Sequence, residues 1–395
     1  MSEFRTIREL CSVVVDCPHS TPKWTANGKI VIRNKNIKHG KIDFSSPSYT
    51  DDEHFAQRIK RAKPQPGDII ITREAPIGDV GMIPENTECC LGQRMVLLRA
   101  NQSVCDNFYL LYSLQSLYVQ HQISWSEGTG TTVSNLRIPH LEQIQIPYLP
   151  LEQQAKISSV LRALEEKIEN NRRLNDNLEQ QAQSYFQELF VDNADPEWAI
   201  GTISDLGTVV GGSTPSKAKP EYYTESGIAW ITPKDLSINK SKFVSHGEND
   251  ITELGLKNSS AAIMPEGTVL FSSRAPIGYI AIAAGEVTTN QGFKSVVPKP
   301  EIGTPFVYFF LKNTLPVIEG MASGSTFKEV SGSTMKNVPA VIPDAETLAK
   351  FSDFCAPIFA QQRILEEQNQ SLATLRDNLL PKLMSGEIDV SAVQL

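Results

Sequence analysis

The chain has 395 residues, more than one hydrophobic core usually serves, so we expect two or more domains. Its 40% hydrophobic and 21% charged residues are typical of a globular protein, and the absence of a long apolar run predicts no membrane association. The sequence has no apolar signal segment, and its six cysteines include no CxxC pair. We therefore expect a cytoplasmic protein with reduced thiols. The net charge of −8 would argue against nucleic acid as a partner only if it were evenly spread.

In chain order, short apolar runs between glycine- and proline-rich turns come first and a long helical stretch follows. Strands are predicted at 68–72, 94–98 and 144–147, because each is a short apolar or β-branched run beside a turn. A short helix is predicted over 110–122. A long helix is predicted over 151–190, which contains neither proline nor glycine.

The second half shows the same order of elements. Strands are predicted at 268–271, 294–297 and 338–343, with a short helix over 306–311. A second long helix follows, and its Pro357 predicts either a kink or a late helix start.

Short motifs recur with a period close to half the chain. Ala-Pro-Ile-Gly occurs at 75–78 and again at 275–278, and Ser-Thr-Pro occurs at 20–22 and again at 213–215. Because several matches keep one order, with offsets of about 192 to 200, chance similarity is excluded and an internal repeat is predicted.

Apolar residues recur every seven positions in both long helices. The seam positions of the first helix are Ile157, Leu164, Leu178 and Tyr185, supported by Val160, Leu161, Ile168 and Leu174; those of the second are Phe351, Ile358, Leu365, Leu372 and Leu379. This period predicts that the two helices pack on each other as an antiparallel coiled coil. Asn171 interrupts the first seam, either as a solvated break or as a device that fixes the register.

The negative charge is concentrated in the helical stretches. Residues 151–195 carry 5 Lys+Arg against 9 Asp+Glu, and residues 344–395 carry 4 against 8. Residues 1–150 carry 16 against 15, and residues 196–343 carry 12 against 13. The two mixed regions are therefore neutral and can present locally basic surfaces, such as the run from Arg58 to Lys63.

Catalytic and cofactor motifs are absent from the sequence. The six histidines show no HxxxH or HExxH spacing, and there is no GxSxG, GxGxxG or GxxxxGK[ST] motif. Cys17 and His19 alone cannot hold zinc, which needs about four ligands. We therefore expect no catalytic residue, no metal site and no cofactor bound by this chain.

The remaining candidates are polar and basic side chains in the repeated turns, which suit contacts to phosphates and base edges. In the first half they are Ser20, Thr21, Lys23, Arg33, Lys35, Arg73, Gln93, Arg94, Thr129 and Thr131. In the second half they are Ser213, Thr214, Lys217, Lys234, Arg274, Gln291, Lys294, Ser325 and Thr326.

Nearly the whole chain resembles one family, the specificity (S) subunits of type I restriction-modification systems. The motifs that carry the resemblance are Asp16–Lys23, Gly67–Gly78 and Leu91–Arg94 in the first half, Gly211–Lys217, Trp230–Leu236 and Asn290–Gly292 in the second, and Leu151–Ile157 and Leu379–Gly386 in the helices. The two halves differ in detail, because Arg73 aligns with Ser273 and Glu74 with Arg274.

The resemblance implies a mixed α/β fold with a pseudo-twofold repeat. It implies two target recognition domains, residues 1–150 and 196–343, each of which would read half of a bipartite double-stranded DNA target. It also implies two long antiparallel helices, residues 151–195 and 344–395, which would set the spacer between the half-sites. The helices would dock two methyltransferase (M) subunits, which bind the methyl donor, and restriction (R) subunits would join that complex. An alternative from the residues alone is a non-catalytic scaffold whose two similar domains bind two copies of a protein.

Overall fold

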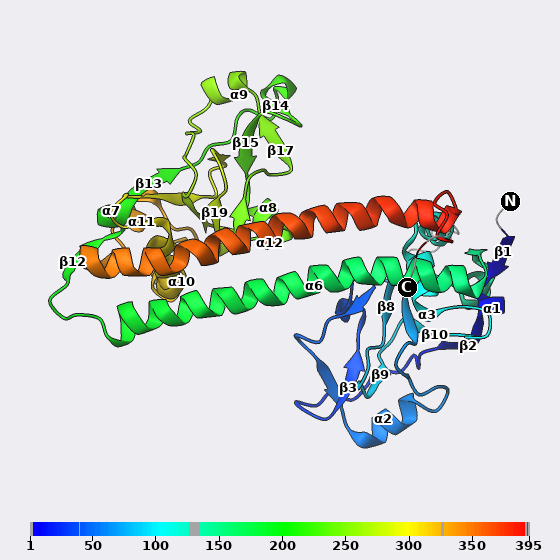
Figure 1. Ribbon diagram of the computed structural model, residues 1–395. Coiled ribbons are helices and arrows are strands. Elements are labelled where there is room, and N and C mark those ends of the chain that lie inside the picture. Colours follow the sequence, from blue (N-terminus) through cyan, green and yellow to red (C-terminus); the bar gives the residue numbers. More distant parts are fainter. Residues whose placement is uncertain (1–2, 39, 126–134, 325–327, 392, 394–395) are drawn as a thin grey trace. The chain divides into compact units, whose positions relative to one another are not determined.

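The computed structural model describes residues 3–38, 40–125, 135–324, 328–391 and 393 (Figure 1). The chain forms two compact units. The first unit consists of Met1–Lys167 together with Ser371–Leu395, and the second unit consists of Ile168–Gln370. The unit boundaries therefore fall inside the two long helices, and each unit contains one end of each helix.

The first unit is a mixed fold of short strands and helices. Its strands are β1 (Glu3–Thr6), β2 (Cys11–Asp16), β3 (Lys29–Ile32), β4 (Ile37–Lys38), β5 (Lys41–Ile42), β6 (Ser48–Thr50), β7 (Ile69–Arg73), β8 (Ile77–Met82), β9 (Cys89–Leu91), β10 (Met95–Ala100) and β11 (Gln145–Tyr148). Its helices before the first long helix are α1 (Ile7–Leu10), α2 (Asp52–Arg58), α3 (Asn107–Gln115), α4 (Leu117–Ser124) and α5 (Ile138–Gln143).

The second unit uses the same kinds of element. Its strands are β12 (Ala199–Thr202), β13 (Gly207–Gly211), β14 (Tyr223–Thr224), β15 (Ile228–Ile231), β16 (Phe243–Val244), β17 (Asn249–Ile251), β18 (Val269–Ser273), β19 (Ile277–Ala283), β20 (Thr288–Thr289), β21 (Lys294–Pro298) and β22 (Pro339–Ile342). Its shorter helices are α7 (Ile203–Leu206), α8 (Pro233–Ile238), α9 (Glu253–Lys257), α10 (Thr304–Met321) and α11 (Gly332–Lys336).

The sheets confirm the internal repeat. The order β2-β10-β7-β8 in the first unit matches β13-β21-β18-β19 in the second, and β6-β3-β9 matches β17-β15-β20. The last pair of each smaller sheet, β3–β9 and β15–β20, is parallel in both units. A two-stranded antiparallel pair also recurs, as β1–β11 and β12–β22. The strands predicted around 68–72, 94–98, 268–271 and 294–297 are confirmed.

The turns before the buried central strands β7 and β18 require glycine. Gly67 and Gly267 both have φ of +83°, a left-handed conformation that side chains rarely adopt. A Cβ atom would also lie 2.5 Å from the Asn107 amide nitrogen at the first turn, and 2.9 Å from the Thr304 hydroxyl at the second. The same backbone geometry therefore recurs before the same strand in each unit.

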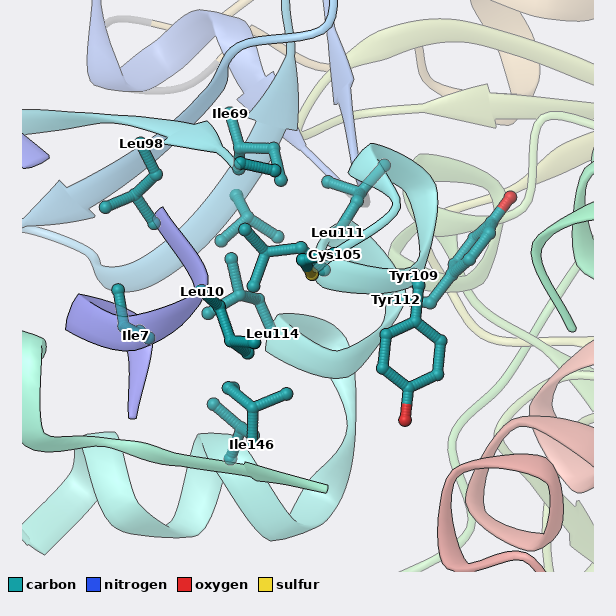
Figure 2. Close-up of a cluster of buried hydrophobic side chains, with 14 of the residues drawn as sticks. Ile7, Leu10, Ile69, Leu98, Cys105, Tyr109, Leu111, Tyr112, Leu114 and Ile146 are labelled. Carbon is teal, nitrogen blue, oxygen red and sulfur yellow. The ribbon is translucent and has the colours of Figure 1, made fainter. Parts of the chain in front are cut away.

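The core of the first unit is filled by side chains from both ends of the chain. Figure 2 shows Ile7, Leu10, Ile69 and Leu98 packed around the helix that carries Tyr109. Side chains from the long helices close the same core, namely Ile157, Leu161, Leu383 and Met384. The core of the second unit is more aromatic and includes Phe186, Phe190, Phe306, Phe309 and Phe351.

The two long helices are α6 (Leu151–Gln187) and α12 (Ala345–Ser385). The start of α6 shares a core with the end of α12 in the first unit, and the end of α6 shares a core with the start of α12 in the second, so the helices are antiparallel as predicted. Because α12 continues through Pro357, the prediction of a late helix start is wrong. Leu174 is 50% exposed, so the prediction that it supports the seam is also wrong.

Asn171 is fully buried, which contradicts a solvated break in the helix pair. Its amide nitrogen donates to the Gln368 side-chain oxygen on α12 at 3.3 Å. A buried polar bond between facing helices is favourable in one register only. Its role in fixing the register therefore stays our prediction.

Two helix predictions need correction in extent. The helix expected over 110–122 is two helices, α3 and α4, because Ser116 has extended backbone and its hydroxyl caps the start of α4. The helix expected over 306–311 is the 18-residue α10, which continues through Pro316.

Candidate nucleic-acid interface

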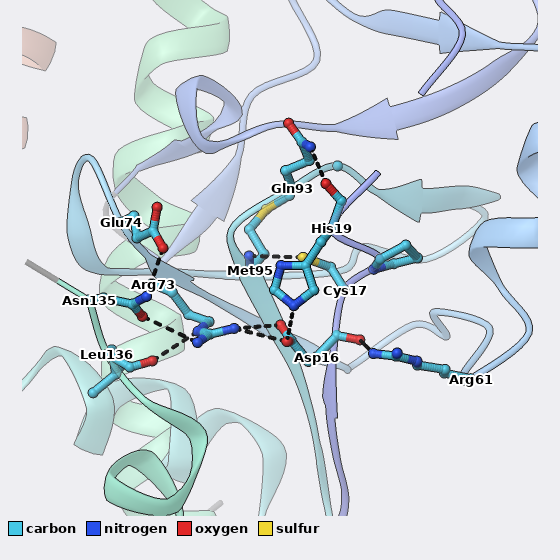
Figure 3. Close-up of polar contacts among 12 residues, drawn as sticks. Asp16, Cys17, His19, Arg61, Arg73, Glu74, Gln93, Met95, Asn135 and Leu136 are labelled. Carbon is cyan, nitrogen blue, oxygen red and sulfur yellow. Dashed lines mark hydrogen bonds and ion pairs between the residues drawn. The ribbon is translucent and has the colours of Figure 1, made fainter. Parts of the chain in front are cut away.

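Two loops that carry predicted contacts are joined in each unit. We call residues 17–23 and 212–217 the Ser-Thr-Pro loops, and residues 91–94 and 290–293 the Gly-Gln loops. In the first unit, the Gln93 side-chain amide donates to the backbone oxygen of His19 (Figure 3). In the second unit, the Thr214 hydroxyl donates to the Gln291 side-chain oxygen. Because each loop pair flanks neighbouring antiparallel strands, β2 with β10 and β13 with β21, the repeat places both pairs equivalently.

Most predicted residues of the first Ser-Thr-Pro loop and its surroundings are exposed, with Gln93 half-buried. The exposed ones are Ser20, Thr21, Lys23, Arg33, Lys35 and Arg94. Lys23 pairs with Asp51 at 3.3 Å, and Lys35 lies 3.4 Å from the Ser46 hydroxyl. These cations are thus held loosely at the surface, where they can contact phosphates.

Arg94 is an exposed cation that is held by an ion pair within the first unit. Its Nε lies 3.2 Å from a carboxylate oxygen of Glu74, and its side chain is 56% exposed. The Asn135 amide donates to the other Glu74 oxygen at 2.8 Å and holds that carboxylate in place. The guanidinium is therefore oriented but still accessible, as a residue that reads a base edge must be.

Arg73 does not lie at the surface, contrary to its inclusion among the candidate contacts. It is 9% exposed, and Nη1 lies 2.9 Å from both carboxylate oxygens of Asp16 (Figure 3). Its Nε donates to the backbone oxygen of Leu136 at 2.9 Å, and Nη2 donates to the Asn135 side-chain oxygen at 3.2 Å. Arg73 is occupied by internal bonds and joins strands β2 and β7 to the segment at 135–136.

The predicted residues of the second unit form a comparable surface. Lys217 and Gln291 are exposed, and Ser213 and Thr214 are half-buried. Lys234 is exposed and pairs with Glu248 at 2.5 Å.

Arg274 and Lys294 share a single carboxylate. Arg274 lies 3.3 Å and Lys294 lies 3.8 Å from the side chain of Glu329. Burial lowers the pKa of Lys294, whose side chain is only 16% exposed. The cationic side chain is therefore accessible at Arg94, where 56% of it is exposed, and largely covered at the equivalent Lys294.

Four of the predicted contacts lie outside the described residues: Thr129, Thr131, Ser325 and Thr326.

The structure also shows residues that the sequence reasoning missed. Trp24 is 45% exposed, and the guanidinium of Arg33 lies 5.0 Å from its ring centroid. Its signal in the sequence is an aromatic residue beside a lysine in a turn-rich segment. Arg58, in contrast, is not part of an exposed basic patch as expected, because its side chain is buried.

In the described part of the chain, no group of three or more His, Cys, Asp or Glu residues could hold a metal ion. All six cysteines are buried, and burial raises the pKa of Cys89 and Cys355 to about 12, which keeps these thiols protonated near neutral pH. None of the described helices is both long and apolar enough to cross a membrane.

Comparisons with known proteins agree on one family. The family model described as "Type I restriction modification DNA specificity domain" matches residues 3–180 and again residues 196–375. The type I restriction enzyme MjaIX specificity subunit of Methanocaldococcus jannaschii is 39% identical over 191 residues, 46% of this chain and 44% of that protein. A putative MjaX specificity subunit of the same organism is 21% identical over 411 residues, 98% of this chain and 94% of that protein.

A solved structure shows the same fold over almost the whole chain. The S subunit of a type I restriction-modification system from M. genitalium has a TM-score of 0.61 and 19% identity, covering 97% of this chain and 96% of that one. The match to the MjaIX subunit, like that to the HindI specificity subunit of Haemophilus influenzae, spans less than half of the relative's length, 44% and 42%.

Proposed function

This chain belongs to the family of type I restriction modification DNA specificity domains, and from this premise we propose that it selects the DNA sequence on which a type I restriction-modification complex acts. Each unit would read one half of a bipartite double-stranded target. One observation carries the proposal: in both units the same two loops are joined and present hydroxyl, amide and cationic groups. Those groups match the donors and acceptors of base edges and phosphates.

The side chains of the loops suit two different kinds of DNA contact, to base edges and to phosphates. The accessible guanidinium of Arg94 can donate two parallel hydrogen bonds to the O6 and N7 atoms of guanine. Exposed lysines such as Lys23 and Lys217 suit phosphate oxygens, which position the protein without reading sequence. The acidic excess lies in the helical segments, whereas the segments that carry the loops are close to neutral and leave local cations to set the charge of the loop surfaces.

We further propose that the chain acts without chemistry of its own, in the cytoplasm. Two methyltransferase subunits, one for each repeat, would dock on the long helices and bind the methyl donor, and restriction subunits would join through that complex. The helices would set the spacer between the two half-sites. The names of the relatives support this assembly, since MjaIX and HindI are both described as specificity subunits of type I restriction enzymes.

Sequencing the methylated sites of the source genome tests the function most directly. We expect adenine methylation at a split motif that disappears when this chain is deleted. A gel-shift series across salt concentrations provides a second test, because DNA affinity should fall linearly on a log–log plot. A protein-binding scaffold would retain no DNA at any salt concentration and would leave methylation unchanged.

A further inference from the structure

Arg58 joins the two loops that carry the candidate contacts of the first unit. It is the last residue of α2, and only 6% of it is exposed. Its guanidinium donates four hydrogen bonds, and all four acceptors are backbone carbonyls: those of Leu91 at 2.7 Å, Ser20 at 2.8 Å, Gly92 at 2.8 Å and Pro18 at 3.1 Å. Two acceptors belong to the Ser-Thr-Pro loop, and two belong to strand β9 and the Gly-Gln loop that follows it.

The geometry of this group makes it a rigid connector. A guanidinium is planar, and its donors point in fixed directions, so four simultaneous bonds define the relative position of the two loops closely. A buried charge is costly unless it is well bonded, and any loop movement that breaks one of these bonds is correspondingly unfavourable. Lysine cannot reproduce the arrangement, since its ammonium has only three donors on one atom.

The other end of α2 contacts the same Ser-Thr-Pro loop. The Asp51 carboxylate caps the helix by accepting the backbone N–H of His54 at 2.9 Å, and it pairs with Lys23 at 3.3 Å. Helix α2 therefore contacts the loop from both of its ends, through the buried Arg58 beside Ser20 and through a surface ion pair with Lys23.

In the second unit, aromatic side chains hold the equivalent loop. The Trp230 indole N–H donates to the backbone oxygen of Ser213 at 3.0 Å, and the Tyr223 hydroxyl donates to that of Pro215 at 2.6 Å. The two rings contact edge to face with centroids 5.7 Å apart. The loop is thus fixed in both units, but by unrelated chemistry, so a change at Arg58 acts on one unit only.

We propose that Arg58 is a positioning residue that determines the sequence preference of the first unit without contacting DNA. It sets the distance and angle between the loop that carries Thr21 and Lys23 and the loop that carries Gln93 and Arg94. This proposal rests on the proposed function, because it assigns the basis of specificity within that same interface.

The test uses the full chain assembled with the methyltransferase subunits of its own system. The variants are Arg58→Met and Arg58→Lys, and the matched control is Lys60→Met, which removes the same charge from an exposed position of the same basic run. Each assembly selects DNA from a library in which both half-sites are randomised. We expect both Arg58 variants to lose preference at the first half-site by about ten-fold per affected position, and to keep the second half-site unchanged.

Salt dependence separates positioning from direct contact. If Arg58 only positions the loops, the slope of log affinity against log salt stays that of the wild type, whereas loss of a phosphate contact lowers it by about one. A reduced slope, or equal weakening at both half-sites, would overturn the proposal. Selection by the Arg58 variants that is indistinguishable from Lys60→Met would overturn it as well.

Hydrogen exchange tests the positioning without DNA. The Cys17 N–H bonds to the Met95 oxygen at 3.0 Å and the Gly92 N–H to the Ile32 oxygen at 2.8 Å, so both amides report on the loops. These two amides should exchange faster in Arg58→Met than in the wild type, and their exchange rates should be unchanged in Lys60→Met. A wild-type assembly with no DNA preference would refute the proposed function, whereas unchanged exchange in Arg58→Met would refute the positioning role alone.

Discussion

In the first unit, the mixed fold is attached to the long helices by apolar packing and by separate hydrogen bonds, such as those of Gln154 and Ser158 to the segment at 104–106, whereas the second unit uses a buried charged cluster. The Tyr112 hydroxyl donates to Glu165 on α6 at 3.0 Å in the first unit. In the second, Glu179 on α6 pairs with the buried Lys242 and, at 2.5 Å, with Lys312.

The helix α12 contributes to the same cluster in the second unit. The Lys242 ammonium donates to the Gln362 side chain at 2.6 Å, and Glu366 accepts the backbone N–H groups of Lys242 and Phe243 at 2.8 and 3.0 Å. Burial opposes ionisation of Glu179, yet the charges of Lys242 and Lys312 hold its pKa below the usual range. The repeat has therefore preserved the backbone arrangement, while the side chains that fasten it to the helices have diverged.

The largest effect is expected from a substitution that breaks this charged cluster. Glu179→Gln should destabilise the second unit by about 3 kcal/mol, because Lys242 stays buried without its carboxylate partner. Urea unfolding monitored in both units measures the loss. Asp176→Asn, an exposed acid on the same helix, is the matched control and should change stability by less than about 0.5 kcal/mol. Equal losses in the two variants would show that the cluster contributes nothing specific.

A second comparison concerns the cations beside the Gly-Gln loops. Arg94→Ala should weaken DNA binding by about 1–3 kcal/mol and relax specificity at one position of the first half-site. Lys294→Ala should have a smaller effect, because only 16% of that side chain is exposed. Binding isotherms on matched and single-mismatch sites measure both. Unchanged affinity of Arg94→Ala for every sequence would remove Arg94 from the interface.

A smaller effect is expected where the first unit meets the helices. Tyr112→Phe removes the hydroxyl that donates to Glu165 and should cost about 1 kcal/mol, since one hydrogen bond is lost while the ring packing stays. The same urea experiment measures it. A loss as large as that of Glu179→Gln would contradict the distinction between the two attachments.

The smallest effect is expected at the helix caps of α2 and α9, which occupy equivalent places in the two units. Asp51 caps α2, and the backbone N–H of His54 holds its pKa at about 2, below its ordinary value of 3.8, whereas the neutral hydroxyl of Thr252 caps α9. The stability that Asp51 contributes is present above pH 3.8 and is lost as the pH falls towards about 2. Asparagine also caps helices but does not titrate. The difference in stability between Asp51→Asn and the wild type should therefore shrink as the pH falls from 3.8 towards about 2. Thermal unfolding from pH 5 to pH 2 measures the difference, and a constant difference would refute the assignment.

The sequence predicted those parts of the fold that depend on local pattern. The strands around Ile69–Ile71 and Val269–Phe271 were predictable because a glycine turn precedes a short apolar run in each. The break at Ser116 was missed, because a serine inside an apolar stretch does not reveal that its backbone is extended.

The candidate site was predictable as loops but not as individual contacts. The pairing of the Ser-Thr-Pro and Gly-Gln loops follows from strand order, which a repeat can suggest. The burial of Arg73 depends on Asp16, 57 positions away, and that of Arg58 on carbonyls 33 to 40 positions away. Side chains that satisfy distant backbone groups leave no local pattern, so a basic residue that braces a loop looks the same in sequence as one that binds DNA.

The shared core of the first unit has a consequence for synthesis of the chain. Ile7 and Leu10 pack in the same core as Leu383 and Val390, which a ribosome adds more than 370 residues later. All of Ile168–Gln370 is translated before those last side chains. We therefore expect the first unit to keep part of its apolar surface open until the end of α12 has left the ribosome, although its other core side chains were made early.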